Sequence, residues 1–132
     1  MIVLMDASAV VDLSIRSDAG ESVRRFLASR ADVALVTVAH LDAEVMSAFA
    51  RLNRADVLTG AEVATLLHRL GSLAMRRLPI TSDLLAAAWE LRDTVAARDA
   101  LYVAAAQGMQ AKVVTTDDCL ARAVPDLVAD LG

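Results

Sequence analysis

The sequence predicts an α/β fold in which helices cover a central, mainly parallel sheet of about four to five strands. Short runs of Val, Leu and Ile, each of a length suited to a buried strand, alternate with longer segments whose apolar residues recur at helical spacing. Only 3% of the residues are aromatic, so the core must be built from Ala, Val and Leu, which suits close packing of helices on a sheet.

The first strand is predicted at residues 2–5, four large apolar residues that end at Asp6. The run is too short for a helix, and three small residues follow the acid. Ligands of parallel α/β sheets bind beyond the carboxyl ends of the strands, so Asp6 is the first candidate site residue. The alternative is that Asp6 only caps the helix that follows.

The remaining elements follow from apolar periodicity and from turn and capping residues. Helices are predicted from about residue 9, over 21–29, 84–91, 98–107 and 118–123, and as a helical hairpin over 41–73. Strands are predicted at 33–36, 77–80 and 112–115, with a candidate edge strand at 127–129. Gly108 is expected to end its helix, and Trp89 is expected to lie in the core.

Composition limits the class of protein. A chain of 132 residues is expected to form one domain, residues 1–132, and the single cysteine, Cys119, excludes a disulfide framework within the chain. No apolar run approaches the roughly 20 residues of a membrane-spanning helix. We therefore expect a soluble, cytoplasmic protein without membrane association. A net charge of −4 argues against a broad basic surface for nucleic acid.

Four acids are expected to meet at one edge of the sheet. Asp6 and Asp117 follow strands whose carboxyl ends lie on the same side, whereas Glu44 and Asp99 sit within apolar helical stripes, near the starts of helices that return over that side. Two like charges about 4 Å apart repel by roughly 4 kcal/mol at an effective dielectric near 20. Such a cluster therefore needs a cation.

The oxygen ligands that the four acids provide indicate which cation the cluster would bind. Carboxylate oxygens without a nearby His or Cys favour Mg²⁺ or Mn²⁺ over Zn²⁺. A magnesium ion in a carboxylate cluster is typical of enzymes that cleave phosphodiesters. Without four of the 17 acids, acidic and basic residues balance at 13 each, so local Arg groups remain free to hold RNA.

Four segments in this order, residues 3–9, 41–45, 97–106 and 113–117, resemble the PIN-domain family, most closely its small bacterial members, the VapC-type toxins of toxin–antitoxin pairs. The resemblance spans nearly the whole chain. It implies a three-layer α/β/α domain and assigns the catalytic and metal-binding acids to Asp6, Glu44, Asp99 and Asp117.

The resemblance also implies supporting residues. Ser8 and Thr115 match hydroxyl residues near the first and last acids, with expected roles in hydrogen bonding to the metal ligands or to metal-bound water. Asp118 is an additional acid that either binds metal through water or caps the following helix, and we favour the cap.

The function implied is that of a magnesium-dependent endoribonuclease toxin that cleaves structured RNA such as tRNA or rRNA. A homodimer and a cognate VapB-type antitoxin are implied as well. The hairpin over 41–73 carries more leucine and valine than its packing needs, so we expect an antitoxin groove there, around Leu66 and Leu67, with the dimer face on the helix over 84–91.

Parts of the sequence also fit other interpretations. Each acid taken alone fits a structural role, and Glu44 could be paired with Arg51 or Arg98. His40 and His68 fit ordinary helix positions, and Arg76–Arg77 fits a solvated face. A haloacid-dehalogenase-like phosphatase needs a second Asp where this chain has Ser8, and a receiver domain needs an acidic pair after the first strand. A PIN-domain RNA-maturation nuclease without an antitoxin is the closest alternative.

Overall fold

The central sheet has four parallel strands in the order β3-β2-β1-β4. The computed structural model describes residues 1–132. The strands are β1 (Ile2–Met5), β2 (Ala34–Val38), β3 (Arg76–Leu78) and β4 (Lys112–Val114). Because β1 pairs with β2 on one side and with β4 on the other, the chain changes direction across the sheet at β1. The predicted parallel sheet is confirmed.

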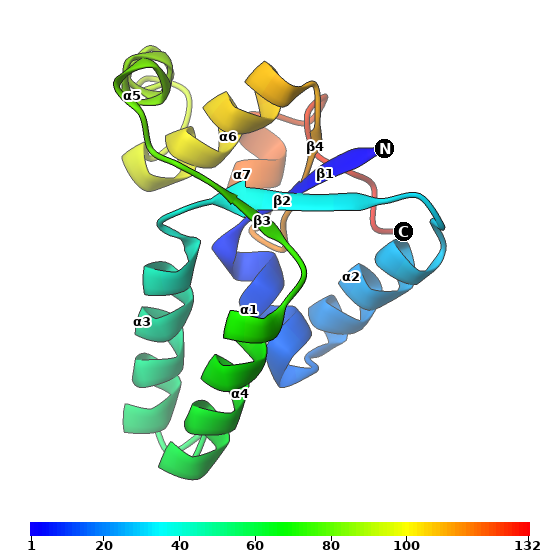
Figure 1. The fold of residues 1–132 in the computed structure, drawn as a ribbon, viewed down its shortest axis with the longest axis vertical. Helices are drawn as coiled ribbons and strands as arrows, with labels where there is room; N and C mark the ends of the chain where they lie inside the picture. Colours follow the sequence, from blue (N-terminus) through cyan, green and yellow to red (C-terminus); the bar gives the residue numbers. More distant parts are fainter.

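Helices cover both faces of this sheet. They are α1 (Ala7–Ile15), α2 (Asp18–Ala28), α3 (Leu41–Arg54), α4 (Gly60–Ser72), α5 (Ser82–Trp89), α6 (Ala97–Met109) and α7 (Asp118–Ala123). Figure 1 shows α1 to α4 on one side of the strands and α5 and α6 on the other, with the α3–α4 hairpin extending away from the sheet. This is the expected three-layer α/β/α arrangement. None of the helices is long and apolar enough to cross a membrane.

Local sequence explains where most helices begin. Side-chain oxygens cap α1, α2, α4, α5 and α7, and Thr59 forms the predicted capping box with Glu62 at the start of α4. The exceptions are α3 and α6, whose N-cap residues, His40 and Ala96, make no side-chain capping hydrogen bond. Both of these uncapped helices carry a candidate site acid near their first turn.

The core follows the composition. Val3, Leu4 and Met5 of β1 are fully buried, and α6 packs on the sheet through a face rich in alanine. Small side chains let this helix approach β1, β2 and β4 closely. The largest fully buried side chains are Tyr102 and Phe49, so two of the four aromatic residues lie at the centre of the core.

Several local predictions were wrong. Trp89 is 64% exposed, because the short helix α5 buries Ala88 instead. Gly108 lies inside α6, and the residue that caps the end of this helix is Gln110, in a left-handed conformation (φ 53°). The candidate edge strand is a single bridge between Val113 and Val128. The predicted bounds of the other elements differ from the observed ones by a few residues.

Arg77 is a structural residue and does not lie on a solvated face. Its guanidinium donates two hydrogen bonds of 2.9 Å to the Asp42 carboxylate and others to the backbone carbonyls of Leu70, Leu73 and Met75. These carbonyls lie in and just beyond the last turn of α4, where backbone acceptors have no helical partner. Arg77 therefore ties the end of α4 to the start of α3.

Candidate active site

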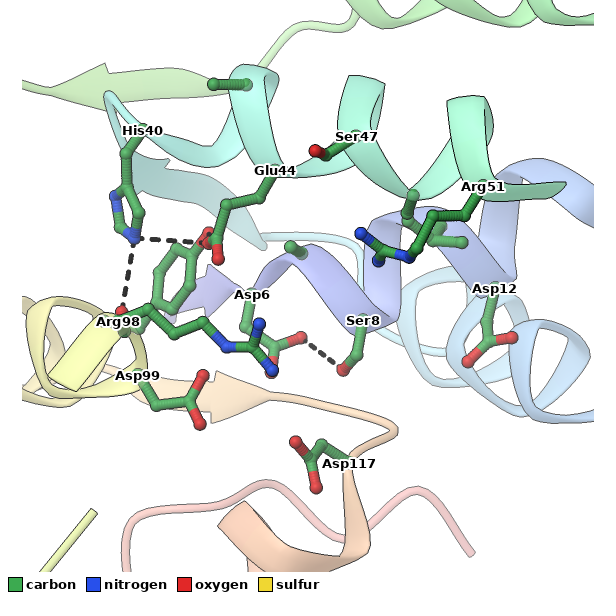
Figure 2. A pocket seen from close by; sticks show the side chains of 15 residues that line it. Asp6, Ser8, Asp12, His40, Glu44, Ser47, Arg51, Arg98, Asp99 and Asp117 are labelled. Atoms are coloured by element: carbon green, nitrogen blue, oxygen red, sulfur yellow. Dashed lines mark hydrogen bonds and ion pairs between the residues drawn. The ribbon is translucent and has the colours of Figure 1, made fainter. Parts of the chain in front are cut away.

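The four predicted acids line one pocket of about 580 Å³ (Figure 2). Asp6 lies directly after β1 and Asp117 after β4, so two of the acids stand at the carboxyl ends of neighbouring strands. Glu44 comes from α3 and Asp99 from the first turn of α6. Residues more than 100 positions apart in the chain thus contribute to one pocket, at the edge of the sheet where parallel α/β folds bind ligands.

Asp6 is a buried carboxylate with three hydrogen-bond donors. Its Oδ1 accepts from the Ala9 N–H at 2.9 Å and from Ser8 Oγ at 2.7 Å, and its Oδ2 accepts from Thr115 Oγ1 at 2.5 Å. Asp6 therefore caps α1 and also faces the pocket, so the two interpretations of this residue are compatible. Burial raises the pKa of Asp6 to about 6, although the three hydrogen bonds act in the opposite direction.

Glu44 is held by the side chains of Tyr102 and His40 and makes no pair with arginine. Its Oε1 accepts a hydrogen bond of 2.5 Å from the Tyr102 hydroxyl and lies 3.3 Å from His40 Nε2. Burial is the main cause that raises the pKa of Tyr102 far above its ordinary value, so the hydroxyl keeps its proton. Neither Arg51 nor Arg98 forms an ion pair with Glu44.

Asp99 and Asp117 add negative charge on the other side of the pocket. Burial, followed by the nearby charge of Asp117, raises the pKa of Asp99. Asp117 caps α7, with Oδ1 accepting from the backbone N–H groups of Cys119 and Leu120. The expectation that Asp118 caps this helix was wrong: Asp118 is the first helical residue, is exposed and lies outside the pocket.

Several further residues line this pocket for which no site role was predicted from the sequence, where Arg51 and Arg98 were considered only as ion-pair partners of Glu44 and His40 only as an ordinary helix residue. His40, Tyr102, Asp12, Arg51 and Arg98 all line it. Helical spacing held a signal for two of them, because His40 and Arg51 lie four residues before and seven residues after Glu44, on the same face of α3. His68 lies on α4, away from the pocket.

The donor chemistry of the pocket fits a hard divalent cation. Four carboxylates provide oxygen ligands and no cysteine lines the pocket, but the expectation that no histidine lies nearby was wrong, because His40 lines the pocket beside Glu44. The pKa values of Asp6 and Asp99 are raised by burial first and by acidic neighbours second. No three acidic, histidine or cysteine side chains are gathered closely enough to hold one ion. Protein hydrogen bonds hold one or both oxygens of Asp6, Glu44 and Asp117, so metal binding requires side-chain adjustment.

Comparison with known proteins identifies the class. The family model described as PIN domain matches residues 3–124, and this chain therefore belongs to the PIN-domain family. Within that family its curated relatives place it among the VapC-type ribonucleases. Ribonuclease VapC3 of Mycobacterium tuberculosis is 46% identical over 128 residues, which cover 93% of this chain and 88% of the relative.

Solved structures share the fold. One of them is the crystal structure of VapC20 from Mycobacterium tuberculosis, described as a sarcin–ricin loop cleaving toxin. Its chain is 20% identical in sequence to this one, the match covers 91% of this chain and 94% of the VapC20 chain, and the TM-score is 0.67. A toxin–antitoxin complex from Klebsiella pneumoniae contains a chain that is 17% identical, with 98% of each chain covered and a TM-score of 0.67. At these identities the similarity concerns the fold alone.

Proposed function

We propose that this protein is the toxin of a type II toxin–antitoxin pair, an endoribonuclease that uses Mg²⁺ or Mn²⁺ to cleave structured RNA such as tRNA or rRNA and so inhibits translation. The observation that supports the proposal most is the meeting of Asp6, Glu44, Asp99 and Asp117 in one pocket. The named activity of a relative with 46% identity supports the ribonuclease assignment. Residues 1–132 act as one domain in this proposal.

In this proposal the four acids hold the divalent ion, which when bound supplies Lewis-acid catalysis for phosphodiester hydrolysis. Ser8 and Thr115 fix the Asp6 carboxylate through the hydrogen bonds described above. Ser8 Oγ also lies 3.1 Å from Thr115 Oγ1 and accepts from the Thr116 N–H, so the two hydroxyls join the start of α1 to the segment after β4. Supporting hydrogen bonds of this kind orient ligands and preserve metal affinity.

Two arginines provide positive charge beside the acids. The side chains of Arg51 and Arg98 extend into the pocket from α3 and from the start of α6 (Figure 2), and neither forms an ion pair with a carboxylate. A guanidinium group donates paired hydrogen bonds that match phosphate oxygens. We therefore assign Arg51 and Arg98 to the RNA phosphates on either side of the scissile bond.

A cleavage assay tests the proposed activity. The purified protein is expected to cut total tRNA and rRNA when Mg²⁺ or Mn²⁺ is present, and to be inactive in EDTA. Asp99→Asn keeps the shape of the side chain but removes one negative charge, so its cleavage is expected to fall below detection. The control is Asp93→Asn, which changes an exposed acid outside the pocket. Equal cleavage by wild type and Asp99→Asn would place the activity elsewhere or in a contaminant.

A second hollow supports an antitoxin site. It has a volume of about 410 Å³, lies between the end of α1 and α4, and its lining includes Ile15, Leu58 and Leu66, with Arg16 and Arg69 at its edge. Leu66 and Leu67 are both half-buried against the core, but of the two only Leu66 lines the hollow. An amphipathic antitoxin helix would place its apolar face in this hollow. A basic side chain from the same partner would then compete with a cation for the acidic pocket.

Co-purification with the product of the neighbouring small gene tests this site. The double variant Leu66→Asp, Leu67→Asp is expected to fold but to lose the antitoxin, because two charges would have to enter an apolar contact. Ala64→Asp introduces a charge at an exposed position of the same helix and is expected to retain binding. Retention of the antitoxin by the double variant would contradict the proposed groove. Failure of any neighbouring product to bind wild type would favour the RNA-maturation nuclease.

The exposed face of α5 supports a homodimer. Leu85 and Trp89 are 53% and 64% exposed, and Ile80 just before the helix is 38% exposed. Apolar patches of this kind mark protein interfaces. Light scattering is expected to show a dimer for wild type and for the control Met46→Glu, which changes an equally exposed residue on α3, and a monomer for Leu85→Glu, Trp89→Glu. A monomeric wild type would contradict this assignment.

A further inference from the structure

Glu44 is the only one of the four acids whose carboxylate is held by aromatic side chains. Tyr102 donates its hydroxyl to Glu44 Oε1 at 2.5 Å, and His40 Nε2 lies 3.3 Å from the same oxygen. The two rings stack on each other with centroids 4.4 Å apart and an angle of 28° between their planes. No protein group donates to the second oxygen, Oε2.

His40 also connects the two helices that begin without a side-chain cap. It stands at the start of α3, and its Nε2 lies 3.3 Å from the backbone carbonyl of Arg98 in the first turn of α6. Because Nε2 faces two acceptors, the Glu44 carboxylate and the Arg98 carbonyl, this nitrogen carries the hydrogen. The ring therefore sets the spacing between the helix that carries Glu44 and the helix that carries Asp99.

The environment of His40 leaves one nitrogen of its imidazole ring without a hydrogen bond. Its Nδ1 is buried and has no hydrogen-bond partner. A buried polar atom without a partner lowers stability, and such atoms require an explanation. Tyr102, by contrast, is fully buried and has its hydroxyl satisfied by the hydrogen bond that it donates to Glu44. Both side chains direct a polar atom to Glu44 Oε1.

We propose that His40 and Tyr102 are positioning residues, which together hold Glu44 Oε1 and leave Oε2 available to bind a divalent cation. The inference rests on the proposed metal-dependent function. A carboxylate anchored through one oxygen loses little rotational freedom when the other binds a cation, so the anchored form binds more tightly. The alternative is that the two rings only fill the core beneath α3 and α6.

Calorimetric titration with Mn²⁺ in the absence of RNA separates these alternatives. Tyr102→Phe keeps the ring, its burial and its stacking and removes only the hydroxyl. It is expected to weaken Mn²⁺ binding by about tenfold or more, with little change in the thermal stability of the metal-free protein. The control Ser72→Ala removes an exposed hydroxyl on α4, outside the pocket, and is expected to bind Mn²⁺ as wild type does.

Substitution of His40 provides a second test. His40→Ala is expected to weaken Mn²⁺ binding, and His40→Gln, whose amide can donate to the same oxygen, is expected to recover part of the loss. Equal or tighter Mn²⁺ binding by Tyr102→Phe, or equal losses in His40→Ala and His40→Gln, would overturn the positioning role. If wild type itself binds no Mn²⁺, the proposed metal-dependent function fails, which is a separate outcome.

Discussion

Asp6→Asn is expected to raise the free energy of unfolding of the metal-free protein by about 2–3 kcal/mol at pH 7.5, and it is also expected to abolish RNA cleavage. Burial raises the pKa of Asp6 from its ordinary value of 3.8 to about 6, so the folded protein holds a charge that it disfavours. Asparagine keeps the acceptor for Ala9 and Ser8 and removes this charge. Urea unfolding in EDTA measures the difference, with Asp93→Asn as the control.

The pH dependence has a definite sign. Since the folded pKa of Asp6 lies above the unfolded value, protonation stabilises the fold, and this contribution is fully present below about pH 4 and lost as the pH rises through about 6. The stability of wild type relative to Asp6→Asn should therefore fall across that window. A variant less stable than wild type at pH 7.5 would show that the ionised carboxylate is a net stabilising cap.

Millimolar Mg²⁺ or Mn²⁺ is expected to stabilise wild type strongly, because a bound cation neutralises charge that only the folded state gathers. At a hundredfold excess over Kd the stabilisation is about 2.7 kcal/mol, equivalent to a rise in Tm of roughly 5–15 °C for a domain of this size. Asp6→Asn and Asp99→Asn should lose most of this rise, and Asp93→Asn should keep it. KCl at matched ionic strength controls for screening, and an equal shift in KCl would contradict specific binding.

Much of the pocket could be predicted because each acid has a local signature. Asp6 ends an apolar run too short for a helix, and Glu44 interrupts the apolar stripe of an otherwise regular helix. In a parallel sheet, strand ends and helix starts face the same edge, so these local patterns were enough to expect convergence. The four carboxylates line one pocket for that reason.

The errors concern properties that local pattern does not determine. Trp89 lies on a helix with apolar residues on several faces, so periodicity cannot decide which face is buried, and the side that packs against α6 buries Ala88 instead. Asp117 and Asp118 both suit a cap, and a shift of one residue decides between them. The contact of Tyr102 with Glu44 joins residues 58 positions apart and has no local signal.

Crystals grown with Mn²⁺ and measured at the manganese absorption edge test the central claim most directly. The claim is that Asp6, Glu44, Asp99 and Asp117 form one divalent-cation site. It predicts anomalous density in the pocket between them, with carboxylate oxygens of at least three of the four acids coordinating the ion. The claim would be contradicted by anomalous density only at other surface acids. It would also be contradicted by a pocket that shows no density at saturating Mn²⁺ and in which the acids keep their present hydrogen bonds.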